Sequence, residues 1–508
     1  MKTINNTARP APDRDVFHRY LFAFACAAAL LVGVLVYTRQ LTTNPAGFFI
    51  DESSVAYNAH TISQDGHDEY GISWPLYFRA FGEYKNPIYI YLLATVFRLT
   101  GPGIFPARLL SATLGIATAV VIGLIGFRLT KQRWLALVLT VLALATPWLF
   151  ALSRIVVEVA LYPLLIALFL LAVQRIAEKS RWGWIDALWI AFSLALLTFT
   201  YSIGRLLAPL LAAGLLLFTK RARFSSIARV WLLYALSLLP MFIYSARHPG
   251  ALEARFKVLT YLTPQSGFMN VWEVARHYFH NLNPWRMLVT GDPGAYQVAS
   301  TYGTGPVLIV TFVLFVAGVC VVLANKRVNA WWAFVIYGLV ISFIPASLTR
   351  DYFHILRLSP VPVFIILLAV PALAWLTKPQ TSSRRALVAI ALIGTVVQGG
   401  YFQYVHAKHG REVARLKIFD ADYHSTIMPK AIAAAGPGPI YVQDAPAIPG
   451  YIQALWYATL DHVPAEKFVI LTEDANVPPG GVVISTKPGC MSCEVLFERS
   501  PYRVYIVK

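Results

Sequence analysis

The chain has 508 residues, of which 57% are hydrophobic and only 13% are charged, and its formal net charge is +18. Water-soluble proteins carry about 25% charged residues, so this composition excludes an ordinary soluble protein and indicates a polytopic membrane protein. The positive charge does not indicate nucleic-acid binding, because Lys and Arg gather in short gaps between apolar runs, as the positive-inside rule describes.

Runs of roughly 20 apolar residues cross a bilayer as helices. The chain contains about eleven candidate runs, at Leu21–Tyr37, Phe105–Phe127, Trp134–Leu152, Val156–Val173, Trp184–Phe199, Ile203–Phe218, Val230–Tyr244, Gly305–Leu323, Trp331–Leu348, Leu358–Leu376 and Ala386–Tyr404. The stretch Pro87–Phe97 is too short to span, which predicts an interfacial or re-entrant helix. If it crossed, a further crossing would be needed and the count would rise to about thirteen.

The gaps between these runs alternate in charge. One set is basic, with Arg128, Lys131 and Arg133 in one gap and Lys326 and Arg327 in another, whereas the other set holds most of the acids. The positive-inside rule places the basic set in the cytoplasm together with a polar tail, residues 1–20. The acidic set then forms outer loops, of which 38–104 and 245–304 are long. No cleavage site follows the first run, which predicts a retained signal anchor.

The membrane part, residues 21–404, is followed by a region of ordinary polarity, residues 405–508. Strand-like runs at Ile440–Gln443, Phe468–Leu471, Val482–Ser485 and Arg503–Val507, with helices over Arg411–Ala435 and Tyr451–Leu460, predict a small extracytoplasmic α/β domain. A second amphipathic helix, Asn270–Leu282, is expected on the membrane surface within the long loop 245–304. The retained N-terminal anchor and a C-x-x-C pair near the C-terminus favour a bacterial inner membrane, although a protein of the endoplasmic-reticulum membrane would carry the same signals.

Cysteine usage adds one expectation about the C-terminal domain. Cys490 and Cys493 form a C-x-x-C pair, and there is no second pair with which to build a four-thiolate zinc site. A local disulfide is the preferred interpretation if this end faces an oxidising compartment, and a redox-active pair is the alternative.

The first outer loop carries the strongest candidate for chemistry. Asp51 and Glu52 follow the first apolar run by about a dozen residues, and such a pair could act as a general base with a neighbouring acid or metal ligand. The alternative is a solvated loop or a helix cap. Farther along the loop, Glu83, Tyr84 and Lys85 place an acid and a cation before the short helix. Lys85 could bind a phosphate as a point charge, or Tyr84 and Lys85 could simply anchor the interface.

Further residues later in the chain add to these candidates. Glu158 lies one turn inside an apolar run, where an acid is costly unless it faces a cavity or a partner. Arg154 lies four residues earlier and could pair with it in a structural ion pair. Arg205, His354 and Arg357 lie at outer ends of runs. Together with Lys85, and with Arg255 as a further candidate, they could surround a lipid-linked phosphate. For each of these residues taken singly, a side chain that snorkels to the interface is the favoured interpretation.

Several of these segments together resemble the GT-C glycosyltransferases. They are Phe49–Glu52, Glu83–Pro87, Gly103–Ser111, Ser153–Glu158 and His354–Arg357. The closest branch is the protein mannosyltransferase and lipid A aminoarabinose transferase group. The resemblance covers most of the membrane part, and its motifs are short. Tyr84 is inserted and Asn86 is a replacement within the family's acid-lysine-proline element, which leaves the role of Glu83 open.

The resemblance implies transfer of a sugar from a polyprenyl phosphate to an acceptor outside the cytoplasm, normally with inversion. In such enzymes the acid of the first outer loop is catalytic, which falls here on Asp51, with Glu52 as its neighbour. Glu158 would match a second acid near the acceptor or a metal, and Arg357 would lie near the donor phosphate. Some relatives use a divalent metal and others use none, so metal dependence stays open.

Two other classes of function remain as alternatives. No Walker A sequence and no Gly-rich dinucleotide motif is present, so an enzyme must receive its energy from the substrate itself. A lipid-linked sugar transporter or flippase would show internal repeats and broken helices near the bilayer midplane, whereas the ionisable residues here gather at one face. A non-catalytic sensor gives no reason for Glu158 or for the acidic first loop.

Overall fold

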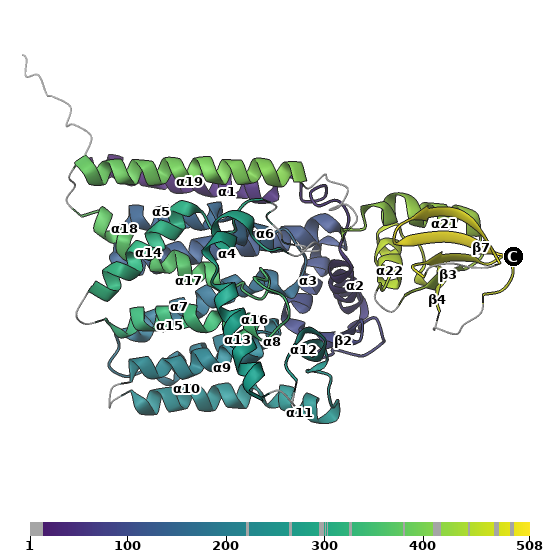
Figure 1. Cartoon of the computed structure of the whole chain (residues 1–508), viewed down its shortest axis with the longest axis horizontal. Coiled ribbons are helices and arrows are strands. Elements are labelled where there is room, and N and C mark those ends of the chain that lie inside the picture. Colours follow the sequence, from purple (N-terminus) through teal and green to yellow (C-terminus); the bar gives the residue numbers. More distant parts are fainter. Residues whose placement is uncertain are drawn as a thin grey trace, which may run out of the picture.

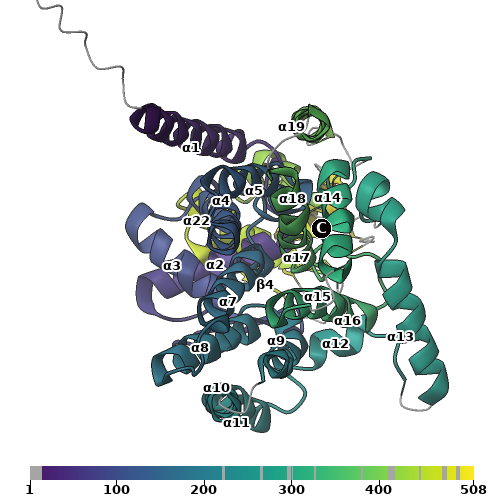
Figure 2. The ribbon, with the colours of Figure 1, turned by 90° about the vertical axis from the view of Figure 1, so that its left-hand side faces the viewer.

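The computed structural model describes residues 14–219, 223–263, 267–293, 299, 301, 303–324, 328–378, 382–409, 418–445, 448–471, 477–487 and 492–508. Figure 1 shows a large group of helices, most of the long ones running along the horizontal axis, and a separate sheet-containing domain at one end. Figure 2 looks along the helices and shows many of them end-on. The protein is therefore a polytopic helical membrane protein with a small C-terminal α/β domain, as the sequence predicted.

Each of the predicted apolar runs contains helix in the structure, although Val156 and Val157 before η1 and the residues 305–308 before α14 are not helical. Within the described residues, six helices or joined helices are long and apolar enough to cross a membrane, and six further apolar helices are shorter. The helices of this part are α1 (Arg14–Thr38), α2 (Ile50–Asp65), α3 (Pro87–Thr100), α4 (Ile104–Thr130), α5 (Arg133–Ala145), α6 (Pro147–Leu152), η1 (Glu158–Leu161), α7 (Tyr162–Ala177), α8 (Trp184–Thr200), α9 (Gly204–Gly214), η2 (Leu215–Phe218), α10 (Phe224–Ser237), α11 (Leu239–Arg247), α12 (Ala254–Leu259), α13 (Gly267–Asn281), η3 (Arg286–Thr290), α14 (Ile309–Ala324), α15 (Ala330–Ser342), α16 (Ile344–Ser347), α17 (Val361–Leu368), α18 (Val370–Leu376) and α19 (Ser382–His409).

Proline explains why several predicted spans appear as two helices. Pro147 occupies the first turn of α6 and separates it from α5, and Pro345 and Pro371 do the same in α16 and α18. Proline lacks the N–H that would continue the preceding helix, but its fixed φ suits the start of a new one. The chain therefore keeps its direction while the helix is interrupted.

The antiparallel helices separate the two sets of loops. Helix α4 begins at Ile104 beside α2 and ends at Thr130, and α5 begins at Arg133 and returns. Arg128 and Arg133 therefore lie at the end of the bundle remote from α2 (Figure 1). The acidic first loop, the hairpin within it and the C-terminal domain lie at the opposite end (Figure 1). The arrangement gathers the candidate site residues at one end of the bundle, while the orientation of the bundle in a membrane remains a prediction.

The first outer loop is more ordered than the sequence predicted, because it contains the 16-residue helix α2. Asp51 and Glu52 lie in its first turn, where carboxylates interact favourably with the helix dipole, and Gly66 ends it in a left-handed conformation with φ of 80°. A hairpin of β1 (Phe78–Ala80) and β2 (Glu83–Lys85) follows. Its turn residues Phe81 and Gly82 both have positive φ, as a two-residue type I′ turn requires.

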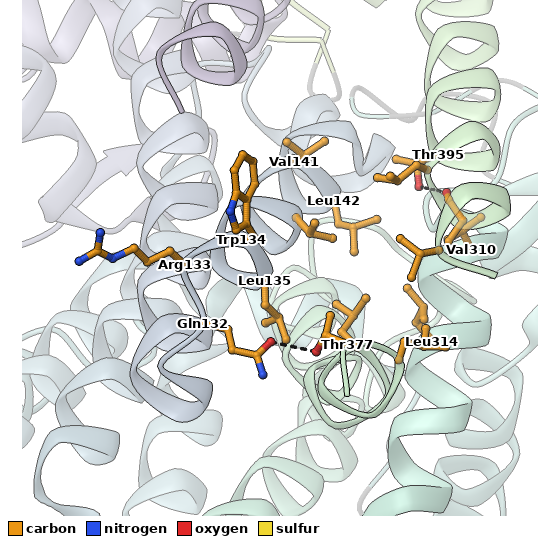
Figure 3. A pocket seen from close by; sticks show the side chains of 16 residues that line it. Gln132, Arg133, Trp134, Leu135, Val141, Leu142, Val310, Leu314, Thr377 and Thr395 are labelled. Carbon is orange, nitrogen blue, oxygen red and sulfur yellow. Dashed lines mark hydrogen bonds between the residues drawn. The ribbon is translucent and has the colours of Figure 1, made fainter. Parts of the chain in front are cut away.

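An apolar cavity of about 440 Å³ lies between α5, α14, α18 and α19. Its wall consists mainly of Leu and Val side chains, and a hydrogen bond of 2.9 Å from Thr377 Oγ1 to Gln132 Oε1 crosses its edge (Figure 3). Among the described residues that line it, none has a carboxylate or an imidazole, and Arg133 is the one charged residue. The described lining therefore lacks a group for acid–base catalysis.

The C-terminal domain is a mixed sheet with strand order β4-β3-β5-β7-β6. Strand β3 pairs in parallel with β4 and β5, whereas β7 is antiparallel to β5 and β6. Four strands and one helix lie where the sequence predicted them, but the edge strand β6 was not predicted. The elements are η4 (Tyr423–Ile427), α21 (Met428–Ala435), β3 (Ile440–Gln443), α22 (Tyr451–Leu460), η5 (Ala465–Lys467), β4 (Phe468–Ile470), β5 (Val482–Ser485), β6 (Cys493–Arg499) and β7 (Tyr502–Val507).

Two predictions fall partly outside the described residues. Of the predicted helix Arg411–Ala435, the described portion forms η4 and α21, and residues 411–417 lie outside the described part. Cys493 is disulfide-bonded, but its predicted partner Cys490 is not among the described residues. The described cysteines of the membrane part, Cys26 and Cys320, are free.

Candidate active site

A polar cavity of about 120 Å³ lies at the end of the helical bundle that carries α2 and the hairpin. Eight residues predicted from the sequence line it, although they come from segments as far apart as the first outer loop and the segment before α17. They are Asp51, Glu83, Tyr84, Lys85, Glu158, Arg205, His354 and Arg357. The structure therefore brings most of the predicted site together, and two predicted residues, Glu52 and Arg154, lie outside the lining.

Asp51 and Lys85 form the central ion pair of this cavity. Lys85 Nζ lies 2.5 Å from Asp51 Oδ1, and the lysine is 5% exposed whereas the aspartate side chain is 31% exposed. Lys85 reaches Asp51 from the end of β2, and its ammonium also lies 5.3 Å from the centre of the Phe81 ring in the hairpin turn. The hairpin thus carries the cation to the first turn of α2.

The charges around Asp51 and Lys85 keep both groups ionised. Burial by itself raises the pKa of Asp51, but the Lys85 ammonium and the Arg255 guanidinium outweigh it and hold that pKa below its usual value. Burial lowers the pKa of Lys85, but the carboxylates of Asp51, Glu158 and Glu83 outweigh it and raise that pKa. Asp51 is therefore a carboxylate whose proton affinity depends on a neighbouring cation.

The other acids of the cavity have partners of their own. Glu83 Oε2 lies 2.8 Å from Arg255 Nη1, which reaches it from α12. Glu158 Oε1 accepts a hydrogen bond of 2.8 Å from the backbone N–H of Asn86. The Asn86 side chain in turn accepts a hydrogen bond of 3.0 Å from Arg205 Nη2. Asn86 therefore links Glu158 of η1 to Arg205 of α9.

The segment before α17 supplies Arg357 and His354. Arg357 Nη1 donates to Asp351 Oδ2 at 2.6 Å and to Thr349 Oγ1 at 3.0 Å, which fixes the guanidinium against the wall. Burial and the Arg357 charge lower the pKa of His354 to about 3, so its imidazole is neutral near pH 7. A neutral imidazole can donate one hydrogen bond and accept another, but it adds no charge to the cavity.

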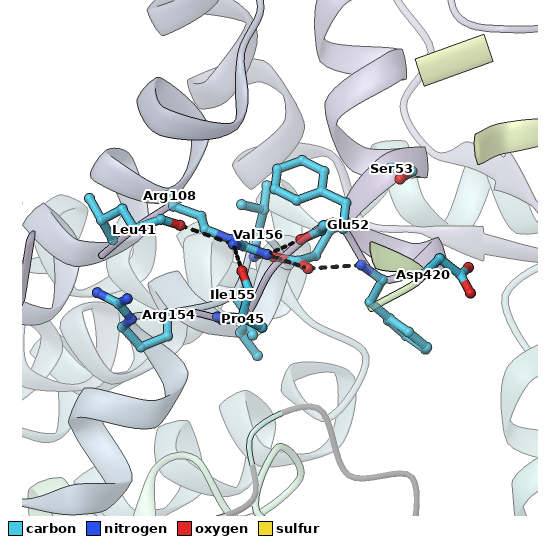
Figure 4. Close-up of polar contacts among 12 residues, drawn as sticks. Leu41, Pro45, Glu52, Ser53, Arg108, Arg154, Ile155, Val156 and Asp420 are labelled. Carbon is cyan, nitrogen blue, oxygen red and sulfur yellow. Dashed lines mark hydrogen bonds and ion pairs between the residues drawn. The ribbon is translucent and has the colours of Figure 1, made fainter. Parts of the chain in front are cut away.

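Glu52 points away from this cavity and into the protein. It forms an ion pair of 3.2 Å with Arg108 from α4, and both side chains are fully buried. Its oxygens also accept hydrogen bonds of 3.0 Å from the backbone N–H groups of Phe49 and Val156. Arg108 donates further hydrogen bonds to the carbonyl oxygens of Leu41, Pro45 and Gly47 (Figure 4). This arrangement satisfies a buried charge pair, which is the usual condition for its stability.

Arg154 also has a buried position outside the cavity. Its guanidinium donates to the carbonyl oxygens of Tyr37, Gln40 and Asn44, at 2.9, 2.9 and 2.7 Å. These contacts tie the turn after α1 to the segment between α6 and η1. Arg154 and Arg108 therefore both hold the chain that leads from the first span into α2.

Three contributors to the cavity were not among the principal candidates from the sequence. Arg255 lies on a short helix within the long loop 245–304, and Tyr201 and Ser202 follow α8. Arg255 was predicted only as an additional phosphate ligand, because the loop 245–304 contains five Lys and Arg residues and no pattern singles out one of them. Tyr201 and Ser202 had none, because polar residues are common at the ends of membrane helices.

The described residues do not form a metal centre of the usual kind. Among them, no group of three or more His, Cys, Asp and Glu side chains is placed to hold a metal ion. The carboxylates of the cavity are instead close to cations and a backbone N–H. The donor set therefore does not fit a divalent metal, and no step proposed for this site depends on one.

The comparisons with known proteins show the fold. No protein-family model and no curated protein sequence matches the chain. A crystal structure of ArnT from Cupriavidus metallidurans bound to undecaprenyl phosphate matches with a TM-score of 0.56 and 13% identity, over 94% of this chain and 97% of that one. The structure of the same protein in the apo state matches with a TM-score of 0.54 and 12% identity, over 97% and 98%. Over nearly its whole length the chain therefore has the fold of ArnT, and the fold implied by the resemblance stated from the sequence is confirmed.

Proposed function

We propose that the protein is an inverting glycosyltransferase that moves a sugar from a polyprenyl-phosphate carrier to a hydroxyl of a glycan, lipid or protein acceptor on the outer face of the membrane. One observation carries the proposal: a carboxylate, Asp51, pairs at 2.5 Å with Lys85 on the wall of a cavity that also holds Arg205, Arg255 and Arg357. The ArnT structure with undecaprenyl phosphate supports the class of carrier.

The proposed reaction is a direct displacement at the anomeric carbon of the sugar. The acceptor oxygen forms the new bond to this carbon and gives its proton to Asp51, acting as general base. The bond from the carbon to the phosphate oxygen breaks, and its electron pair leaves with the polyprenyl phosphate. Attack opposite to the leaving group inverts the anomeric configuration.

The cations of the cavity suit the leaving group. A phosphate monoester leaves without a strong acid, provided that its growing negative charge is stabilised, and preorganised cations do this well away from bulk water. Lys85, Arg205 and Arg357 are the proposed phosphate ligands, and Arg255 joins them. Guanidinium groups bind phosphate through two parallel hydrogen bonds, whereas Lys85 acts as a point charge. His354 would add a neutral hydrogen-bond donor.

The ion pair between Asp51 and Lys85 gives the donor a way to prepare the base. In the structure the Lys85 ammonium stabilises the ionised form of Asp51, which makes that carboxylate a weak base. A bound phosphate would compete for the ammonium and bring its own negative charge, and both changes raise the pKa of Asp51. The base would thus become stronger only when the donor is in place.

The remaining predicted residues take supporting roles in this proposal. Glu158 and Glu83 lie on the wall and orient the acceptor, and Tyr84 contributes to the same surface. Glu52 and Arg154 hold the chain around Asp51 without touching substrate, since both are buried outside the lining. The cavity would face the periplasm or cell exterior, because it lies at the end of the bundle opposite the basic loops.

The proposal is tested by a transfer assay on the purified protein in lipid discs. A panel of labelled polyprenyl-phosphate sugars is supplied with membrane extract as acceptor, and the release of free polyprenyl phosphate is followed. Wild type should release it, and Asp51→Asn should not. Equal release by both would keep the enzyme but exclude Asp51 as the base.

A transporter of lipid-linked sugars is separated from the enzyme by a second measurement. The same donors are placed on one side of protein-containing liposomes, and their movement across the bilayer is followed. Translocation without release of polyprenyl phosphate would contradict the transferase.

A further inference from the structure

The C-terminal domain contacts Phe48, which lies three residues before Asp51 in the chain. The backbone N–H of Phe48 donates to Tyr457 Oη at 2.9 Å, and the carbonyl oxygen of Phe48 accepts from Gln453 Nε2 at 3.0 Å. The Phe48 ring stacks on Trp456, with centroids 5.5 Å apart and planes inclined by 6°. Both polar groups of one residue and its side chain are therefore held by helix α22.

Gln453 extends this contact into the first turn of α2. Ser53 Oγ donates to Gln453 Oε1 at 2.6 Å, and Ser53 comes two residues after Asp51. The amide nitrogen of Gln453 donates to Phe48 and also to Asp420 Oδ2 at 2.8 Å. Gln453, Ser53 and Phe48 are all fully buried. The side-chain amide thus joins a point before Asp51 to a point after it.

The rest of the domain fixes Gln453. Asp420 accepts a second hydrogen bond of 2.8 Å from Tyr502 Oη on β7, so its carboxyl connects the sheet to the amide. Because the amide oxygen accepts from Ser53 while the amide nitrogen serves two acceptors, this network allows only one orientation of the side chain. A buried network with all its members paired is rigid.

The C-terminal domain contacts the start of α2 on one side, and the membrane part contacts it on the opposite side. Arg108 holds Glu52 and Gly47 from α4, and its guanidinium lies 4.9 Å from the centre of the Phe48 ring. Figure 4 shows Ser53 and Asp420 on one side of this cluster and Arg108 at its centre. The turn that carries Asp51 is thus fixed between α4 and the C-terminal domain.

We propose that the C-terminal domain is a positioning element of the reaction centre, with Gln453 and Tyr457 as positioning residues that set the orientation of Asp51. This inference rests on the proposed function for its kinetic part only. The alternative is a domain that merely packs on the membrane part and adds stability. A positioning role predicts an effect on turnover, because a reacting group displaced by about 1 Å can cost about 10²-fold in rate.

Two matched substitutions separate these roles. Tyr457→Phe removes the hydroxyl that binds Phe48, whereas Tyr505→Phe removes a hydroxyl of the same domain that binds Gln443 at 3.0 Å within the sheet. Both lose one hydrogen bond, but only the first changes a contact with the chain that leads into α2. Gln453→Leu is the stronger variant of the first kind, and the milder Tyr457→Phe serves if Gln453→Leu does not fold.

The first readout is hydrogen–deuterium exchange of the full chain in lipid discs, which requires no catalytic activity. Peptides that span residues 48–56 should exchange at least about tenfold faster in Tyr457→Phe and Gln453→Leu than in wild type or Tyr505→Phe, because the start of α2 loses its anchors. Unchanged exchange in both variants would overturn the inference, whatever the transfer assay shows.

The second readout is the steady-state rate of transfer. The kcat of Tyr457→Phe should fall about tenfold while the KM for the lipid donor stays within about twofold, because the phosphate ligands do not change. Tyr505→Phe should match wild type in both. A loss of kcat that is equal in both tyrosine variants would indicate general destabilisation and overturn the positioning role. If wild type itself transfers no sugar while exchange responds as expected, the proposed function fails and the contact with α2 stands.

Discussion

Asp51 and Glu52 are adjacent in the sequence, yet the structure gives them opposite environments. Glu52 is fully buried and has Arg108 and two backbone N–H groups as partners, whereas Asp51 lies on a cavity wall with one close partner, Lys85. Successive residues of a helix point about 100° apart, so one turn presents one carboxylate to the cavity and the other to the interior. A fully satisfied carboxylate stabilises structure, and a partly satisfied one is free to exchange its partner for a substrate.

The largest effect on activity is expected from a substitution of Asp51. Asp51→Asn removes the proposed base and should lower the rate of transfer about 10²–10⁴-fold, which is the usual contribution of general acid–base catalysis. The unfolding temperature should change little. Asp65→Asn is the matched control, because Asp65 is an exposed residue at the end of the same helix. A variant of Asp51 that transfers at the wild-type rate would contradict the assignment.

A substitution that disrupts the buried ion pair of Glu52 with Arg108 should lower the stability of the protein. Arg108→Leu leaves the Glu52 carboxylate buried without its cation, and breaking a buried ion pair in this way costs about 3–5 kcal/mol. We expect a markedly lower unfolding temperature by tryptophan fluorescence in detergent. Asp186→Asn, which opens the more exposed pair between Asp186 and Lys179, should cost about 1 kcal/mol or less. Similar unfolding temperatures for the two variants would refute the structural role of the Glu52 pair.

The effect of Lys85 on the pKa of Asp51 can be tested by the pH dependence of the reaction. The base acts in its ionised form, and Lys85 helps to hold its pKa in the free enzyme below the usual value, so kcat/KM of wild type should fall only at pH below the ordinary carboxyl range. Lys85→Met removes the ammonium and leaves burial to raise the pKa of Asp51, so the acid limb of the rate profile should move to higher pH. Lys85→Arg keeps the charge and should leave the limb near its original position. Coincident limbs for Lys85→Met and wild type would show that the pair does not control the base.

The smallest effect is expected at His354. Because burial and Arg357 lower its pKa to about 3, the imidazole should stay neutral throughout pH 5–8. The rate profiles of wild type and His354→Asn should therefore have the same shape over this range, even if their heights differ. A wild-type inflection near pH 6.5 that disappears in the variant would show that His354 titrates there.

Much of the fold and part of the site could be predicted from local sequence patterns. The apolar runs, the short helix after Pro87 and four strands of the C-terminal domain are each encoded in the periodicity and length of one segment. The helix α2 was missed because its residues lack a strong apolar face, although its acidic first turn and Gly66 were visible signals. The edge strand β6 was missed because five of its seven residues are exposed or polar.

The sequence by itself determined the class of the protein and the end of the bundle at which the acids gather, because hydropathy and charge act through each segment separately. Only the tertiary structure decided that Asp51 faces the cavity while Glu52 faces Arg108, and that Arg255 and Arg357 lie on the same wall. Only packing also joined α22 to the start of α2. These choices depend on the direction of side chains from segments distant in the chain, and no local pattern contains that information.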